Sequence, residues 1–180
     1  HLRIAVELAE LLGVDSLRML PCSLPPHREA LSVSAEQRMA MLQLAVADYP
    51  QLVADDIELQ RGGATYTIDT LRQVRQQIGA DVPLYLCIGI DVLITLDSCQ
   101  EWRQLTDHCH LVVSARPNYV LPTSGELADW INQHRCDDLP QLKQCSAGRL
   151  FLCDTTRLAI SSTQIRDKIK HSDTIDFLTP

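Results

Sequence analysis

The sequence has 180 residues, of which 46% are hydrophobic and 22% are charged, and its formal net charge is −7. This length suits one globular domain with a buried core. The acidic balance argues against a broad nucleic-acid-binding face but leaves room for a local basic pocket. No apolar run approaches the length of a membrane span and no secretory signal is visible, so we expect a cytoplasmic protein with no membrane or nucleic-acid partner.

The seven cysteines are scattered along the chain, and their number is odd. No C-x-x-C pair occurs, which disfavours a disulfide framework. Cys109 stands between His108 and His110 at strand spacing, without a second pair of zinc ligands elsewhere. The sequence therefore predicts free thiols in a reducing compartment and no metal held by the protein itself.

The chain opens on an amphipathic helix over residues 1–13, with His1 at its N-terminus and Gly13 closing it. A short strand over residues 17–20 runs into a proline-rich loop that ends in His27 and Arg28. Prolines stiffen this loop, and two cationic groups at its end suit a phosphate. A plain surface loop is an equally good interpretation.

A second helix is predicted over residues 34–48, because Ser34 and Gln37 form a capping-box pattern. Apolar and polar residues alternate imperfectly over residues 52–59, which predicts a strand, and a pair of glycines then ends it.

Thr65 or Thr67 is expected to cap the next helix. Hydroxyls at such a helix start suit a ligand carboxylate, although simple capping is the alternative. The continuously apolar run over residues 83–88 is typical of a strand buried on both faces of a parallel sheet. Gly89 and Asp91 follow it, where a ligand can approach the backbone and a carboxylate can accept ribose hydroxyls. A turn glycine and a helix-capping aspartate are the simpler interpretation.

Further along, a short helix over residues 101–107 carries Trp102, and a strand over residues 110–115 leads to Arg116. The region from 118 to 148 is the least regular, and we interpret it as a surface excursion.

That excursion contains one helix, over residues 126–134, and a last strand follows it over residues 150–153. Strand and helix alternate through most of the chain, which predicts a doubly wound parallel α/β sheet with its ligand crevice at the carboxyl ends of the strands.

The last helix begins with Ser161, Ser162 and Thr163, and Gln164 and Arg166 follow. Ser161 and Gln164 match a capping box. Free backbone N–H groups, the positive end of the helix dipole, hydroxyls and a guanidinium all favour a phosphate site. An ordinary capped surface helix is the alternative.

No Walker A motif and no arrangement typical of covalent catalysis occurs in the chain. The polar groups suit phosphoryl or nucleotidyl transfer by positioning and electrostatic stabilisation, with a magnesium ion bridging phosphate oxygens.

The run from Ile160 to Arg166 resembles the I-S-S-T-x-I-R signature of the H-x-G-H nucleotidyltransferase superfamily. Four further segments match one branch of that superfamily in order, namely Leu24-Pro25-Pro26-His27-Arg28, Tyr66-Thr67, Ile88-Gly89-Ile90-Asp91-Val92-Leu93 and Val113-Ser114-Ala115-Arg116-Pro117. That branch is the bacterial nicotinate-nucleotide adenylyltransferase family.

The resemblance implies a Rossmann-like nucleotidyltransferase fold and a single domain over residues 1–180. It also implies an enzyme of NAD biosynthesis that joins nicotinate mononucleotide to the AMP part of ATP, giving deamido-NAD and pyrophosphate. Magnesium would be bound through the ATP phosphates. The resemblance leaves a homo-oligomer open.

The resemblance also implies the roles of individual residues. The implied catalytic residues are His1 and Arg166. The implied ATP and phosphate ligands are His27, Arg28, Ser161, Ser162, Thr163 and Arg166. Gly89, Asp91 and Arg116 would bind the nucleotide, and Tyr66, Thr67, Cys99 and Trp102 would face the nicotinate.

Three departures from the family pattern stand out. The family's N-terminal strand, its Gly-Gly-x-Phe-Asp-Pro turn and the first histidine are absent from these 180 residues, and we expect them upstream of His1. Cys99 stands where the family has a ring-stacking Trp. The family's closing helix is absent beyond Pro180, so the chain is truncated at both ends relative to the family.

Other functions stay open at this point. The acceptor could instead be nicotinamide mononucleotide or phosphopantetheine. A nucleotide-binding regulatory domain without catalysis and a flavin- or dinucleotide-binding module are the non-enzymatic alternatives.

Overall fold

The computed structural model describes residues 1–21, 33–115, 119–156 and 162–175. In this part of the chain the α-helices are α1 (Leu2–Leu12), α2 (Ala35–Val46), α3 (Ile57–Arg61), α4 (Thr67–Ile78), α5 (Ile90–Leu93), α6 (Leu105–His108), α7 (Glu126–His134), α8 (Leu139–Leu142) and α9 (Ser162–Lys170). The strands are β1 (Leu17–Met19), β2 (Leu52–Ala54), β3 (Tyr85–Gly89), β4 (His110–Ser114), β5 (Arg135–Cys136) and β6 (Leu150–Cys153). Two 3-10 helices, η1 (Leu96–Ser98) and η2 (Trp102–Gln104), lie between α5 and α6.

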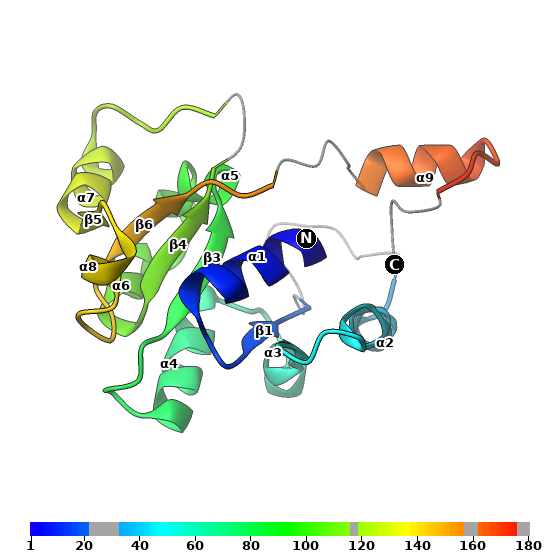
Figure 1. The fold of residues 1–180 in the computed structure, drawn as a ribbon, viewed down its shortest axis with the longest axis horizontal. Helices are drawn as coiled ribbons and strands as arrows, with labels where there is room; N and C mark the ends of the chain where they lie inside the picture. The colour runs from blue at the N-terminus through cyan, green and yellow to red at the C-terminus, as the bar shows by residue number, and fades with distance from the viewer. Residues whose placement is uncertain (22–32, 116–118, 157–161, 176–180) are drawn as a thin grey trace.

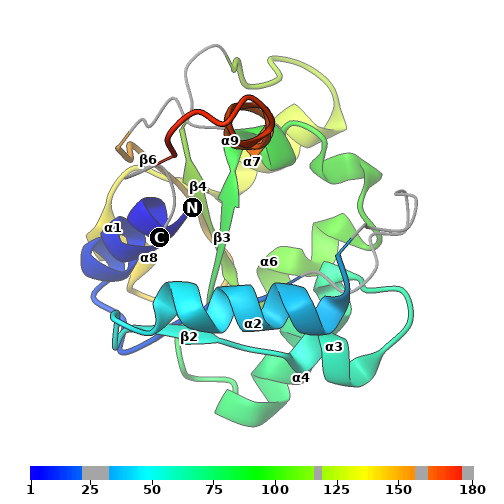
Figure 2. The ribbon, with the colours of Figure 1, turned by 90° about the vertical axis from the view of Figure 1, so that its right-hand side faces the viewer.

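All the paired strands run parallel. β1 pairs with β2, and a second sheet has the strand order β3-β4-β6-β5. The helices are distributed around these sheets, as Figures 1 and 2 show. The predicted parallel α/β fold is therefore confirmed.

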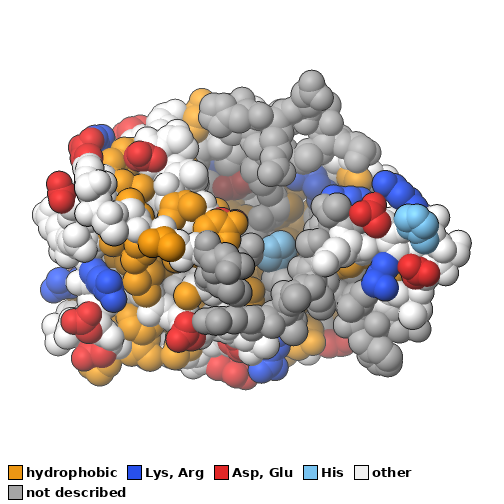
Figure 3. Space-filling view, turned by 90° about the horizontal axis from the view of Figure 1, so that it is seen from above, with side chains coloured by type: hydrophobic (Ala, Val, Ile, Leu, Met, Phe, Trp, Pro, Cys, Tyr) orange, Lys and Arg blue, Asp and Glu red, His pale blue; other side chains and the backbone are white. Residues whose placement is uncertain are grey.

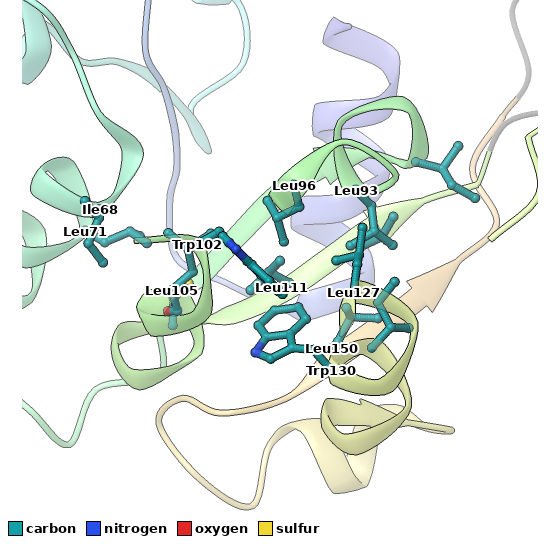
Figure 4. Close-up of a cluster of buried hydrophobic side chains, with 14 residues drawn as sticks. Ile68, Leu71, Leu93, Leu96, Trp102, Leu105, Leu111, Leu127, Trp130 and Leu150 are labelled. Atoms are coloured by element: carbon teal, nitrogen blue, oxygen red, sulfur yellow. Dashed lines mark hydrogen bonds between the residues drawn. The ribbon is translucent and has the colours of Figure 1, made fainter. Parts of the chain in front are cut away.

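Strand β4 is one of the two inner strands of the larger sheet, and all five of its residues are buried. Leu111 and Val113 contribute to a cluster with side chains from α4, α5 and α7, which Figure 4 shows in close-up. Val112, between them, faces a second cluster with α1 and α8. The alternation of the strand thus builds one apolar core on each face of the sheet.

Helix α1 joins the two sheets through its buried face. Leu8 and Leu12 pack in the cluster that contains Val112 of β4. Ala5 packs in a third cluster, with Val46 of α2 and Leu52 of β2. The helix ends at a glycine in the left-handed region, as the sequence predicts.

Side chains close the amino ends of the strands. Arg75 of α4 donates from Nε to the carbonyl of His108 at 3.0 Å, and from Nη1 to the carbonyl of Val82 at 2.6 Å. His110 is fully buried; its Nδ1 accepts from the amide of Arg149 at 3.1 Å, and its Nε2 lies 2.9 Å from the carbonyl of Cys145. Burial lowers the pKa of His110 below its usual value.

Two predicted strands are corrected. The strand predicted over residues 52–59 ends at Ala54, because Asp55 Oδ1 accepts from the amide of Ile57 at 3.0 Å and the chain turns into α3. β3 was expected to be buried on both faces, but all its residues are only half-buried. In the described residues it pairs with β4 alone and lies at a sheet edge.

The predicted surface excursion is also wrong. Helix α7 has the predicted bounds, but its Leu127, Trp130 and Ile131 belong to the main core. β5 then pairs in parallel with β6 and extends the sheet. A two-residue strand leaves too short a pattern for sequence analysis to detect.

We predict that acid destabilises this protein partly through His110. The unfolded state takes up a proton near pH 6.5, whereas the buried ring has a lowered pKa and resists protonation. Stability is therefore fully present above about pH 6.5 and is lost as the pH falls below it, by at most about 1.4 kcal/mol per pH unit. Urea unfolding of His110→Gln between pH 7 and 5 should show a flatter dependence than the wild type. His171→Gln, at an exposed position, is the control; equal slopes for the wild type and His110→Gln would contradict the assignment.

Candidate active site

The candidate site lies at the carboxyl ends of the strands. Figures 1 and 2 show the N-terminus of α1, the short helix α5 and helix α9 on the side toward which β3 and β4 point. This is the edge where parallel α/β sheets bind their ligands.

His1 is the N-cap of α1 and is exposed. Its carbonyl accepts from the amide of Ala5 at 2.9 Å, so the helix begins directly at this residue. The first turn holds no acidic side chain, and no side chain caps the helix. The positive end of the helix dipole is thus uncompensated there, which suits an anion.

Gly89 and Asp91 lie together at the end of β3. Gly89 pairs with Ser114 of β4 and is the N-cap of α5, with φ −80° and ψ 156°. Asp91 belongs to the first turn of that helix and is half-buried. The glycine therefore caps the helix, and Asp91 does not.

The start of α4 differs from the prediction. Its N-cap is Tyr66, which has an extended backbone and makes no side-chain capping bond, so neither Thr65 nor Thr67 caps the helix. Thr67 is exposed. Thr65 is only 9% exposed, and among the described residues its Oγ1 has no hydrogen-bond partner. Buried hydroxyls are normally satisfied, so this one points to a missing partner.

Tyr66 packs against the same apolar cluster as Ile88 of β3 and Ile90 of α5. The start of α4 and the end of β3 are thus parts of one packed unit. An anionic group at the α4 terminus would lie beside the strand that carries Gly89.

Cys99 and Trp102 occupy very different environments. Cys99 is an exposed residue at the C-terminal end of η1. Its thiol still loses some contact with water, which raises its pKa, so the thiol stays protonated at neutral pH. Trp102 is 5% exposed, with its ring 5.3 Å from that of Trp130 and with Arg103 Cζ 4.6 Å from its centroid. Trp102 supports the core, as Figure 4 shows, and offers little surface for stacking on a ligand.

A contact between residues far apart in the sequence holds this region against α4. Arg72 donates from Nη2 to Glu101 Oε2 at 2.7 Å and to Gln104 Oε1 at 3.0 Å. Glu101 has φ 50°, a left-handed conformation that is uncommon for a residue with a side chain. The bond from Arg72 holds the pKa of Glu101 below its usual value. Arg and Glu 29 positions apart carry no local signal that could have revealed this pair.

Helix α9 carries Arg166, which is exposed. Figure 1 shows the helix standing away from the sheet, beyond its carboxyl edge. At this end of the molecule Figure 3 shows Lys and Arg side chains mixed with acidic side chains and a His. The sequence of α9 itself contains Arg166, Lys168 and Lys170 together with Asp167. The structure therefore places α9, which carries Arg166, beyond the carboxyl edge of the sheet.

Several predicted site residues lie outside the described part of the chain. These are His27, Arg28, Arg116 and Ser161. The backbone of Ser162 and Thr163 forms the first turn of α9, but their side chains are also outside it. Their roles stay predictions.

The described cysteines are free thiols, as expected. Burial raises the pKa of Cys87 and Cys109 to about 12, and that of Cys153 to about 11, so these thiols are inert at neutral pH. Within the described ranges, no group of three or more His, Cys, Asp or Glu could hold a metal ion, and no helix is long and apolar enough to cross a membrane.

The fold resembles that of solved nucleotidyltransferases. Two structures of Plasmodium falciparum nicotinic acid mononucleotide adenylyltransferase, one complexed with APC and one with NaAD, superpose with TM-scores of 0.68 and 0.69. The alignments cover 99% and 97% of this chain and 80% and 79% of the other, at 14% sequence identity. At this identity the likeness concerns the fold.

Sequence comparison gives the family. Residues 1–168 match the cytidylyltransferase-like family. The chain is 42% identical over 180 residues to a probable nicotinate-nucleotide adenylyltransferase from Pseudomonas aeruginosa, covering 84% of that protein, and 40% identical over 181 residues to one from Serratia proteamaculans, covering 82%. All of this chain is aligned in both cases. The chain therefore belongs to the nicotinate-nucleotide adenylyltransferases of the cytidylyltransferase-like family, as the motifs predict.

Proposed function

We infer that this protein transfers the adenylyl group of ATP to nicotinate mononucleotide, giving deamido-NAD and pyrophosphate. The observation that carries the inference is the identity of about 40% along the whole chain to proteins named for this reaction. The site geometry supports it. The N-termini of α1 and α4, which no side chain caps, and Gly89 at the end of β3 lie at the same edge of the sheet.

The reaction needs charge stabilisation more than covalent chemistry. A phosphate oxygen of nicotinate mononucleotide attacks the α-phosphorus of ATP, a P–O bond forms, and the bond to the leaving pyrophosphate breaks. Negative charge is spread over the phosphoryl oxygens during this step. We assign its stabilisation to His1 with the N-terminus of α1, and to Arg166.

The remaining phosphate contacts belong to the loop with His27 and Arg28 and to Ser161, Ser162 and Thr163. This part of the proposal rests on the signature motif. Gly89 and Asp91, with Arg116, are assigned to the nucleotide, because β3 ends there with its backbone at the sheet edge.

The nicotinate carboxylate is assigned to the start of α4. The helix lacks a side-chain cap, and the buried Thr65 hydroxyl lacks a partner among the described residues. An anion would accept from the free N–H groups of this first turn and from the Thr65 hydroxyl, with Tyr66 and Thr67 beside it. Asp69, in the same turn, already offsets part of the helix dipole. Cys99 lies in the segment that Arg72 holds against α4 and would meet the ring without stacking on it.

Magnesium would be held by the phosphates of ATP, and it would supply positive charge that offsets the charge of the phosphoryl oxygens.

The acceptor distinguishes this proposal from its rivals. A carboxylate gains from the helix dipole at α4, whereas the neutral amide of nicotinamide mononucleotide gains less. Pyrophosphate release should therefore be measured with ATP, Mg²⁺ and each of nicotinate mononucleotide, nicotinamide mononucleotide and phosphopantetheine. Turnover with none of them, despite nucleotide binding, would favour a regulatory domain.

We predict that Arg166→Ala lowers kcat by roughly 10²-fold or more, as expected for the loss of one transition-state donor. Steady-state pyrophosphate release measures this. Lys168→Ala, on the same helix, is the matched control and should retain activity. Near wild-type turnover of Arg166→Ala would contradict the assigned role.

We predict that Thr65→Val raises the KM for nicotinate mononucleotide by about tenfold, since a hydrogen bond to a charged group is lost. The change removes a buried hydroxyl that has no described partner, so the free energy of unfolding should stay equal or increase. Kinetics and urea unfolding of the same variant test both parts. A drop in stability with an unchanged KM would assign the hydroxyl to the fold instead.

A further inference from the structure

A carboxylate on α1 holds the chain that leads from β6 to α9. Thr156 donates its amide to Glu7 Oε2 at 2.7 Å and its hydroxyl to Glu7 Oε1. Arg3, one turn earlier on α1, donates from Nε to Glu7 Oε1 at 2.6 Å. One carboxylate thus takes three donors, two of them from a residue 149 positions away.

The contact between Glu7 and Thr156 lies just beyond the end of strand β6. Thr156 comes three residues after Cys153, the last of β6, and six residues before Ser162, the first of α9. Up to Cys153 the chain is fixed by the sheet, where the amide of Ala115 donates to the Cys153 carbonyl at 2.9 Å. Glu7 therefore acts on the chain beyond the point where pairing with the sheet ends.

We propose that Glu7 is a positioning residue for adenylyl transfer, which fixes Thr156 against the helix that begins at His1 and so sets where the chain departs toward α9 and Arg166. The proposal rests on the proposed function, because it assumes that His1 and Arg166 serve one reacting phosphate.

The chemistry of the contact suits this role. Two hydrogen bonds from one residue to the two oxygens of one carboxylate fix orientation as well as distance. The bonds from Thr156 lower the pKa of Glu7 to about 2, so the side chain is charged throughout the neutral range. Glu7 is partly accessible to solvent, so we expect it to act mainly on the position of the chain at Thr156 and less on its stability. Small displacements of catalytic groups are enough to lower the reaction rate.

The test compares Glu7→Ala and Glu7→Gln with Glu10→Gln. Glu10 is exposed on the same helix, and its carboxylate takes part in none of the side-chain hydrogen bonds or ion pairs given for the described residues. Glu7→Ala should raise the KM for ATP by about threefold to tenfold, in the range of single coupled contacts, and lower kcat. The KM for nicotinate mononucleotide should not change, because that substrate is assigned to α4. Glu7→Gln keeps one acceptor and should be intermediate.

A double-mutant cycle makes the test specific. Thr156→Val removes the hydroxyl donor and should raise the KM for ATP in the wild type, but it should add little in the Glu7→Ala background, where its acceptor is already gone. Additive effects, an unchanged KM for ATP, or equal increases in both KM values would overturn the proposal.

Amide exchange gives a readout that does not need activity. The Thr156 amide should exchange faster in Glu7→Ala than in Glu10→Gln, because its acceptor is lost. If the wild type released no pyrophosphate, the proposed function would fail while this contact could still be observed. Active wild type, with exchange and kinetics both unaffected by Glu7→Ala, would refute the positioning role alone.

Discussion

The packing of α1 across both sheets is the constraint on which the rest of the structure depends. In the described residues the β1–β2 pair and the four-stranded sheet share no strand pairing. Leu8 and Leu12 of α1 bury themselves against the larger sheet, and Ala5 packs with β2 and α2. Burial of each Leu side chain stabilises the folded state by on the order of 1.5–3 kcal/mol. The same packing sets the helix antiparallel to the strands, which carries His1 to their carboxyl ends (Figure 1).

In the proposed reaction, one helix would act through two different physical effects. Its N-terminus supplies an uncompensated positive potential at His1, and its second turn supplies the carboxylate that holds Thr156. The proposed acceptor side is separate: it consists of the start of α4, with the Thr65 hydroxyl that has no partner among the described residues, and of the segment that Arg72 holds in place. The α4 half packs on β3 and β4 through the main core, whereas α1 packs on the same strands through the second cluster, which contains Leu8, Leu12 and Val112.

Much of the fold was predictable because its signals are local. The capping box of α2, the glycine that ends α1 and the apolar strand β6 all appear as expected, since each depends on neighbours within a few residues. β3 was misjudged because the same apolar run suits a central or an edge strand. The predicted site residues follow motif resemblance, whereas Thr65, Arg72 and Glu7 become visible only when burial and long-range partners are known. No spacing rule connects positions 7 and 156.

The central claim is that one rim of the sheet, with α1 at one side and α4 at the other, holds both nucleotides during adenylyl transfer. A crystal structure with deamido-NAD bound tests this most directly. The account predicts the phosphate nearer the AMP part beside His1 and the N-terminus of α1, and the nicotinate carboxylate at Thr65 and the first turn of α4. A product molecule bound at the amino ends of the strands, or with its pyridine ring remote from α4, would contradict it.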